Sequence, residues 1–202
     1  MSNPETHILF VHGAGEGAYK EDKKLAESLG DSLGRGYEVH YLKMPDEENA
    51  PYEQWKERIE NELTALNGAV VLVGHSVGAS ILAKCLSEIE SKKSVVGVFL
   101  LSGPFWSGKG WRYEGYEELE LKKDIAAHYP KNAEIFLYHC RDDEIVPFDH
   151  LALYATLLPQ AAIHELDEGG HQFDNDLSAV AEDIRNLRKV YSVDDSNIQT
   201  GK

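Results

Sequence analysis

Short apolar runs alternate along this chain with longer segments whose apolar residues recur every three or four positions. The short runs are typical of buried strands, and the longer segments are typical of amphipathic helices. Six strands are predicted, at residues 7–11, 37–42, 69–73, 95–101, 133–139 and 161–166. Strands that alternate with helices form a parallel sheet with right-handed crossovers. The pattern therefore predicts an α/β fold, a three-layer α/β/α sandwich around a six-stranded, mainly parallel sheet.

The helices and the edge of the sheet follow from the same pattern. Polar and apolar residues alternate at 37–42, which predicts a half-exposed edge strand. Asp174 is expected to cap the last helix. Within the irregular stretch 103–132 only 117–127 has a helical pattern. Other helices are expected at 25–33, 52–66, 77–89 and 148–158. We expect one domain over residues 1–191, followed by a polar tail at 192–202.

One strand-to-helix junction carries Gly74-His75-Ser76-Val77-Gly78. A G-x-S-x-G sequence between a strand and a helix is the pattern of a nucleophile elbow, whose tight turn raises the serine hydroxyl above the sheet. The free N–H groups at the start of the following helix favour negative charge there. Taken alone, the five residues fit equally well a glycine-rich turn with an incidental serine.

Two later loops supply the partners that a nucleophilic serine needs. A serine requires a base, and the base requires an orienting acid. His171 follows the last strand, and the acids 142–144 follow the fifth. Because parallel strands end at one edge of a sheet, these loops are expected to meet Ser76 there. The chain order of serine, acid and histidine is the order found in α/β-hydrolases.

A serine nucleophile also needs donors for the negative charge that develops on its substrate. Backbone N–H groups supply them in an oxyanion hole. One donor is expected from Val77, directly after the nucleophile. The other is expected from the loop after the first strand, where Ala14 is the first choice and Gly15 the alternative.

The sequence resembles the small, cap-less members of the α/β-hydrolase fold serine hydrolases, up to about Tyr191. The resemblance rests on Phe10-Val11-His12-Gly13, the pentapeptide around Ser76, Asp143-Glu144-Ile145-Val146-Pro147 and Gly169-Gly170-His171. It implies the strand order 2-1-3-4-5-6, without the antiparallel N-terminal hairpin of larger members. It also implies that Asp143 is the orienting acid, because the acid of the family lies four residues before the proline. Asp142 is then expected to face solvent or to pair with Arg141.

The expected reaction is hydrolysis of a small carboxylic ester through an acyl-enzyme intermediate, with neither metal nor organic cofactor. The family also includes lipases, thioesterases, amidases and some non-hydrolytic enzymes, so the resemblance does not name the substrate. The pocket is expected at His12, Gly13, Phe105, Trp106 and Trp111. The aromatic residues fit a cover over the core equally well. Without a cap domain the site should be shallow and favour short acyl chains.

Two other functions fit parts of the chain. Gly13-Ala14-Gly15-Glu16-Gly17-Ala18 matches the glycine pattern of a dinucleotide-binding loop, but the acid expected at the end of the second strand is missing. A hydrolase scaffold could also serve as a protein-interaction module without catalysis. His75 is assigned no chemistry. Structural or solvent roles are expected for the histidines at 7, 40, 128, 150 and 164.

Composition narrows the class of partner. The formal net charge of −15 repels phosphate backbones and anionic lipid surfaces, which argues against nucleic acid and membrane as partners. There is no apolar run of transmembrane length and no signal-peptide pattern at the N-terminus. Two cysteines, Cys85 and Cys140, are too few for a disulfide framework. We therefore expect a cytoplasmic enzyme acting on a small-molecule ester.

Overall fold

The computed structural model describes residues 6–89, 95–106, 108, 111 and 116–197. Six strands form one sheet in the order β2-β1-β3-β4-β5-β6, and each neighbouring pair is parallel. The strands are β1 (Thr6–Val11), β2 (Tyr37–Leu42), β3 (Val70–His75), β4 (Val95–Leu101), β5 (Glu134–Cys140) and β6 (Ala162–Leu166). The expected α/β-hydrolase strand order is confirmed.

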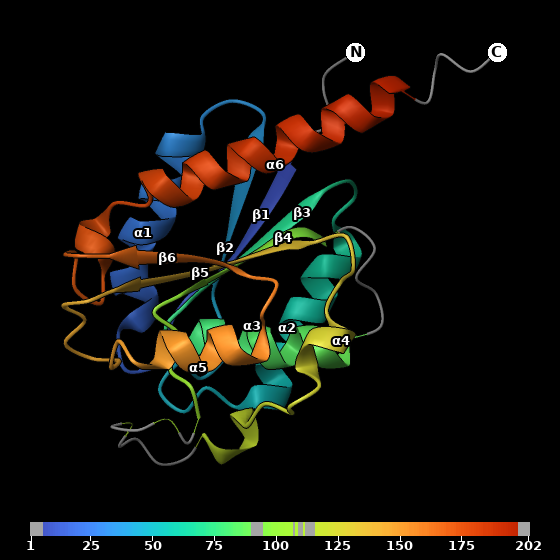
Figure 1. The fold of residues 1–202 in the computed structure, drawn as a ribbon. Coiled ribbons are helices and arrows are strands. Elements are labelled where there is room, and N and C mark those ends of the chain that lie inside the picture. Colours follow the sequence, from blue (N-terminus) through green and yellow to red (C-terminus); the bar gives the residue numbers. More distant parts are fainter. Residues whose placement is uncertain (1–5, 90–94, 107, 109–110, 112–115, 198–202) are drawn as a thin grey trace.

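Helices cover both faces of the sheet and make three layers (Figure 1). One face carries α1 (Ala18–Leu33) and α6 (Ser178–Asn197). The other carries α2 (Tyr52–Ala65), α3 (Val77–Glu88), α4 (Ile125–His128) and α5 (His150–Leu157). The central strands are almost wholly apolar because both of their faces are buried. Among the described helices, none is both long enough and apolar enough to cross a membrane.

Helices α1 and α6 are far apart in the sequence but pack side by side (Figure 1). The buried leucines of α1 and the apolar face of α6 belong to one core cluster. Two hydrogen bonds add to this contact. The N–H of Leu177 donates to Ser28 Oγ at 3.0 Å, and Arg185 Nη1 donates to the carbonyl of Ser32 at 2.6 Å. The docking of α6 fixes the loop that precedes it.

The expected cap at Asp174 is wrong. The 3-10 turn η2 (Phe173–Asn175) has left-handed φ angles at all three of its residues, so the chain is not yet helical at Asp174. Helix α6 begins four residues later, and Asp176 Oδ1 accepts the N–H of Ser178 at 2.8 Å. The helix then continues to Asn197, through the first part of the segment expected to be a tail.

The sequence pattern predicts one helix at 117–127, and this prediction is also wrong. It forms the 3-10 turn η1 (Glu117–Leu119) and, after a break, the short helix α4. Leu119 and Ile125 are both buried in the core beside α3. Their separation of six positions does not place them on one helical face, so each turn is anchored by its own apolar residue.

Candidate active site

Ser76 lies in a strained turn between β3 and α3. Its φ of 52° and ψ of −130° are unusual for a residue with a side chain. Glycines make the turn possible, because a Cβ on Gly78 would lie 2.3 Å from the carbonyl oxygen of His12. A Cβ on Gly74 would lie 2.7 Å from the Cα of Ala79. Ser76 is therefore held at the carboxyl edge of the sheet, at the start of α3.

His171 and Asp143 meet from the loops after β6 and β5. Nδ1 of His171 lies 3.0 Å from Oδ2 and 3.1 Å from Oδ1 of Asp143. Burial lowers the pKa of His171, and the hydrogen bond to Asp143 only partly offsets this effect. The imidazole is therefore neutral at neutral pH. With Nδ1–H donating to the carboxylate, Nε2 carries the lone pair that can accept a proton.

The carboxylate of Asp143 is fully buried and tightly held. His139 Nε2 lies 3.1 Å from its Oδ2, and the N–H groups of Ile145 and Val146 donate to Oδ1 at 2.9 and 2.8 Å. Burial alone would raise the pKa of Asp143, but the hydrogen bonds from His139 and His171 hold it far below its usual range. Asp143 is an anion with a fixed orientation.

The two acids on either side of Asp143 hold the histidine loop instead. Asp142 Oδ1 accepts the N–H of Gly170 at 2.9 Å, and its Oδ2 accepts the N–H of Gly169 at 3.3 Å. Glu144 Oε2 accepts the N–H of His171 at 3.1 Å. Asp142 is exposed to solvent, which was one of the two expected alternatives, but the other alternative, pairing with Arg141, is wrong. The guanidinium of Arg141 pairs with Glu165 and Asp167.

His171 is also tied to the turn that carries Ser76. The ring of His75, the residue before Ser76, donates from Nε2 to the carbonyl of His171 at 2.9 Å. The centroids of the two imidazole rings are 4.8 Å apart. No hydrogen bond links the Ser76 hydroxyl to the His171 ring, both of which the structure describes. Catalytic hydrogen bonds are often long without substrate and shorten in the complex.

The backbone donors beside Ser76 can now be compared. The N–H of Gly15 donates to the carbonyl of Glu47 at 2.7 Å and is not available to a ligand. The N–H groups of Ala14 and Val77 donate to no described residue. Of the two donors considered in the loop after β1, only Ala14 has an uncommitted N–H.

The same loop does not suit a dinucleotide. Glu47 Oε1 accepts the N–H of Gly17 at 3.2 Å, and its Oε2 accepts the N–H of Tyr19 at 2.8 Å. A carboxylate thus occupies the N-terminus of α1, where the pyrophosphate of a dinucleotide would bind. This contact counts against the dinucleotide-binding alternative.

A second buried pair of aspartate and histidine lies beneath Ser76. His75 Nδ1 donates to Asp22 Oδ2 at 2.8 Å, and the side chains are 1% and 2% exposed. Asp22 also accepts the N–H of Gly13 at 2.8 Å and Nε2 of Gln172 at 3.0 Å. Burial alone would raise the pKa of Asp22, but the charge of His75 lowers it to about 2. Burial likewise opposes the charge on His75, and Asp22 outweighs it and raises the pKa of His75.

Sequence reasoning missed this pair. Asp22 lies three residues before Leu25 and seven before Leu29, so it shares the buried face of α1. An acid on an apolar face needs a buried partner, because an unpaired charge is costly to bury. That spacing was the available signal, and His75, which was assigned no chemistry, is the partner.

The residues expected to form the pocket take different positions. Trp106 and Trp111 line a narrow pocket of about 10 Å³ beside Val77, together with Ser80, Pro104, Tyr116 and Leu119. Phe105 packs against the ring of Tyr154, with 5.2 Å between ring centroids. The tryptophans therefore border a small space beside Val77, the residue after Ser76, whereas Phe105 does not line this space.

The two expected pocket residues in the loop after β1 also differ. A Cβ on Gly13 would lie 3.1 Å from Cβ of Ser76, so the absence of a side chain keeps the approach to the serine open. His12 is fully buried, and both of its ring nitrogens are engaged. Nδ1 donates to the carbonyl of Gly13 at 2.6 Å, and Nε2 accepts the N–H of Met44 at 3.1 Å. His12 therefore shapes the loop and does not face a substrate.

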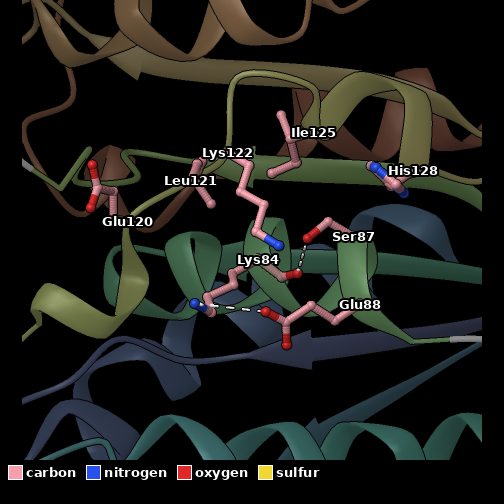
Figure 2. A pocket seen from close by; sticks show the side chains of 8 residues that line it. All are labelled: Lys84, Ser87, Glu88, Glu120, Leu121, Lys122, Ile125 and His128. Carbon is pink, nitrogen blue, oxygen red and sulfur yellow. Dashed lines mark hydrogen bonds and ion pairs between the residues drawn. The ribbon is translucent and has the colours of Figure 1, made fainter.

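A separate hollow lies toward the other end of α3 (Figure 2). Lys84 Nζ lies 3.7 Å from Glu88 Oε1 there, and Ser87 Oγ donates to the carbonyl of Lys84 at 2.7 Å. The remaining lining residues are Glu120, Leu121, Lys122, Ile125 and His128. None of the residues expected to act on substrate is among them. An ion pair near the surface contributes little, and this hollow is not the candidate active site.

Several solved structures resemble this fold over almost the whole length of the chain. Est1E from Butyrivibrio proteoclasticus, solved with ferulic acid bound, has a TM-score of 0.68 at 14% identity and covers 93% of this chain and 90% of its own. The Pyrococcus furiosus esterase Pf2001 has a TM-score of 0.64 at 15% identity, with 93% and 81% covered. The ydeN gene product of B. subtilis has a TM-score of 0.64 at 19% identity, with 93% and 100% covered. At these identities the likeness shows the α/β-hydrolase fold.

Sequence comparison identifies the family. The YdeN protein of Bacillus subtilis (strain 168) is 25% identical over 149 residues, which cover 71% of this chain and 75% of YdeN. The family model described as "Serine hydrolase" matches residues 28–180, which is more than half of the 202 residues. The chain therefore belongs to the serine hydrolase family.

Proposed function

We propose that this protein hydrolyses small carboxylic esters by transferring the acyl group to Ser76. One observation carries the proposal. The strained serine turn and the buried pair of His171 and Asp143 meet at the carboxyl edge of the sheet. One of the structural neighbours, Pf2001 from Pyrococcus furiosus, is named an esterase, which supports an ester as the substrate.

In the first half of the reaction, Ser76 Oγ attacks the ester carbonyl carbon while His171 Nε2 takes the hydroxyl proton. The carbonyl oxygen becomes an oxyanion, which the N–H groups of Ala14 and Val77 stabilise. Asp143 keeps the Nδ1–H tautomer of His171 and stabilises the imidazolium that forms. The tetrahedral intermediate collapses, and His171 protonates the departing alcohol.

In the second half, His171 removes a proton from water, which attacks the acyl carbonyl. The same N–H groups stabilise the second oxyanion. When this intermediate collapses, the proton on His171 returns to Ser76 Oγ and the carboxylic acid leaves. Every proton transfer in this scheme passes through the imidazole of His171.

The pocket beside Val77 favours a small acyl group. Its volume of about 10 Å³ between Trp106 and Trp111 is roughly the space needed for one water molecule. We therefore propose that acetyl esters are better substrates than long-chain esters.

The deciding experiment combines active-site labelling with turnover. A fluorophosphonate probe should label Ser76 in the wild-type protein, as located by peptide mass spectrometry, and should not label Ser76→Ala. Ser87→Ala is the matched control, because Ser87 lies on α3 away from the turn, and it should label normally. Loss of the nucleophile should reduce kcat on p-nitrophenyl acetate by a factor on the order of 10⁴–10⁶.

Two results would contradict the proposal. Near-normal turnover by Ser76→Ala would show that another group does the chemistry. A folded wild-type protein that neither reacts with the probe nor hydrolyses esters would instead support the alternative of an interaction module.

A further inference from the structure

Two histidines and a glutamate gather on β1 and β2, away from the carboxyl ends of these strands. In the parallel register His7 lies opposite Glu38, and His40 follows Glu38 by two positions on the same strand. Side chains two positions apart on a strand point to the same face of a sheet. The three side chains therefore project from one face, at an edge strand. The sequence had suggested only structural or solvent roles for His7 and His40.

The distances between the three side chains are short. His7 Nδ1 lies 3.0 Å from His40 Nε2 and 3.4 Å from Glu38 Oε2. His40 Nε2 lies 3.6 Å from Glu38 Oε2. Within the described part of the chain, this is the single group of three His, Cys, Asp or Glu side chains whose ligand atoms all lie within 4.8 Å of one another.

These distances match the edges of a zinc coordination tetrahedron. Bonds of about 2.0–2.1 Å to a tetrahedral zinc ion place the ligand atoms about 3.3–3.4 Å apart. An ion about 0.7 Å above the plane of the three atoms would lie about 2.05 Å from each of them. We propose that His7, Glu38 and His40 bind a zinc ion, with a water molecule as the fourth ligand.

The chemistry of the group favours this cation. Two imidazoles and one carboxylate suit zinc, whereas magnesium and calcium prefer ligand sets made of oxygen atoms. The side chains of His7, Glu38 and His40 are 17%, 52% and 23% exposed, so an ion can reach them from solvent and keep a water ligand. The net charge of −15 also attracts cations.

The position of the site indicates what the ion does. His7 is the second residue of β1, whereas Ser76 and its partners lie beyond the carboxyl ends of the strands. The zinc ion is therefore remote from the proposed hydrolysis. β2 is an edge strand with one neighbour in the sheet, β1. An ion bound by side chains of both strands would cross-link them and stabilise this edge.

The test uses metal-free protein prepared with a chelator and then dialysed. Zinc is titrated against a chromophoric zinc indicator at neutral pH for the wild type, His40→Ala, Glu38→Gln and His128→Ala. His128 is the matched control, because it is a histidine paired with a carboxylate, Asp124, at another place on the surface. Melting temperatures with and without zinc are measured for each protein.

We expect the wild type and His128→Ala to bind one more zinc ion than His40→Ala. Glu38→Gln should weaken that site by about tenfold or more. Zinc should raise the melting temperature of the wild type by several degrees and leave that of His40→Ala unchanged. A large excess of magnesium or calcium should not compete.

Equal zinc titrations of the wild type and His40→Ala would overturn the proposal. So would binding that magnesium displaces. If the metal-free His40→Ala melts well below the wild type, Glu38→Gln decides, because it keeps the size of the side chain and removes a ligand charge. Ester hydrolysis should be unchanged in all the variants, so the result does not depend on the proposed function.

Discussion

Nδ1 of His75 donates to Oδ2 of Asp22 at 2.8 Å, and this buried pair links the segments that meet around Ser76. Asp22 holds the N–H of Gly13 in the loop after β1, and His75 holds the carbonyl of His171. Neither side chain is exposed enough to touch substrate. The pair therefore positions the groups of the proposed reaction and takes no direct part in it.

Asp22→Asn should lower kcat more than it changes KM. The variant removes the charge that holds His75, so the carbonyl of His171 and the N–H of Gly13 lose their fixed positions. Breaking a buried pair costs about 3–5 kcal/mol of stability, which should appear as a lower melting temperature. Asp31→Asn is the matched control, on the exposed side of the same helix. Wild-type kcat in a folded Asp22→Asn would contradict the positioning role.

The stability of Asp22→Asn relative to the wild type should depend on pH. Asp22 has a lowered pKa of about 2, so its contribution is present above its unfolded pKa and is lost as the pH falls toward 2. His75 has a raised pKa, so its contribution is present below its unfolded value near 6.5 and is lost as the pH rises through the folded value. The stability difference between the two proteins, measured by urea unfolding, should be largest between about pH 4 and pH 6.5.

Among the three adjacent acids, only Asp143 should be essential for kcat. In the serine proteases, an amide in place of the orienting carboxylate reduces kcat by about 10⁴. Asp143→Asn should therefore lose orders of magnitude in ester hydrolysis with a modest change in KM. Asp142→Asn and Glu144→Gln keep an oxygen that can accept the N–H groups of the histidine loop, and they should lose less than about tenfold. If Asp142→Asn is the crippled variant, Asp143 is not the orienting acid.

The fall in kcat/KM at low pH should follow the protonation of His171. This residue must be neutral to take the proton from Ser76, and burial lowers its pKa. The midpoint of the fall in kcat/KM should therefore lie below the ordinary histidine value of about 6.5. Asp143 raises the pKa of His171, so the residual activity of Asp143→Asn should have a still lower midpoint. A wild-type midpoint well above 6.5 would mean that His171 is not the titrating base.

The wall at Trp106 should limit the length of the acyl chain. Trp106→Ala removes one side of the narrow pocket beside Val77, and it should raise kcat/KM for octanoyl relative to acetyl p-nitrophenyl esters. Ile163→Ala is the control, because Ile163 is 48% exposed on β6 and does not line this pocket. A wild-type preference for long-chain esters would refute the proposal of a short acyl site.

Gly78→Ala should be far less stable than the wild type, although it adds only one methyl group. The new Cβ would lie 2.3 Å from the carbonyl oxygen of His12 and 2.6 Å from that of Val11, both of which belong to the backbone. Neither atom can move without disturbing β1 or the loop after it. The free energy of unfolding, measured with urea, should fall much more for Gly78→Ala than for the control variant Gly30→Ala. In the control, the new Cβ would meet only a side-chain methyl group of Val39, at 3.6 Å.

The sequence predicts the sheet well because its apolar runs are long and clear. The run at 95–101 matches β4 residue for residue, and the leucines at 25, 29 and 33 lie in α1 as expected. The errors occur where another interaction outweighs the local pattern. Asp174 resembles a helix cap, but the chain there is left-handed, and Asp176 supplies the acceptor.

Sequence motifs predict which residues lie together in the loops after the strands. They do not predict contacts that depend on how a helix packs against the sheet. The predicted placement of Ser76, His171 and Asp143 follows from loops that come after β3, β6 and β5, at the carboxyl edge of one parallel sheet. The contact of Asp22 with His75 joins a helix to a strand end across 53 positions, and no short motif records it. Similarly, no local pattern shows that Asp142 holds the N–H groups of Gly169 and Gly170.

The packing of α6 against α1 has a consequence for synthesis of the protein. Asp22 and Gln172, which hydrogen-bond to each other, are 150 positions apart. At translation rates of about 5–20 residues per second, roughly 8 to 30 seconds separate the two on the ribosome. His171 is made just before Gln172, and its loop is held in place by a helix that is made later still. A nascent chain therefore cannot complete the site before α6 has been made, and we expect ester hydrolysis to begin only after that helix has left the ribosome.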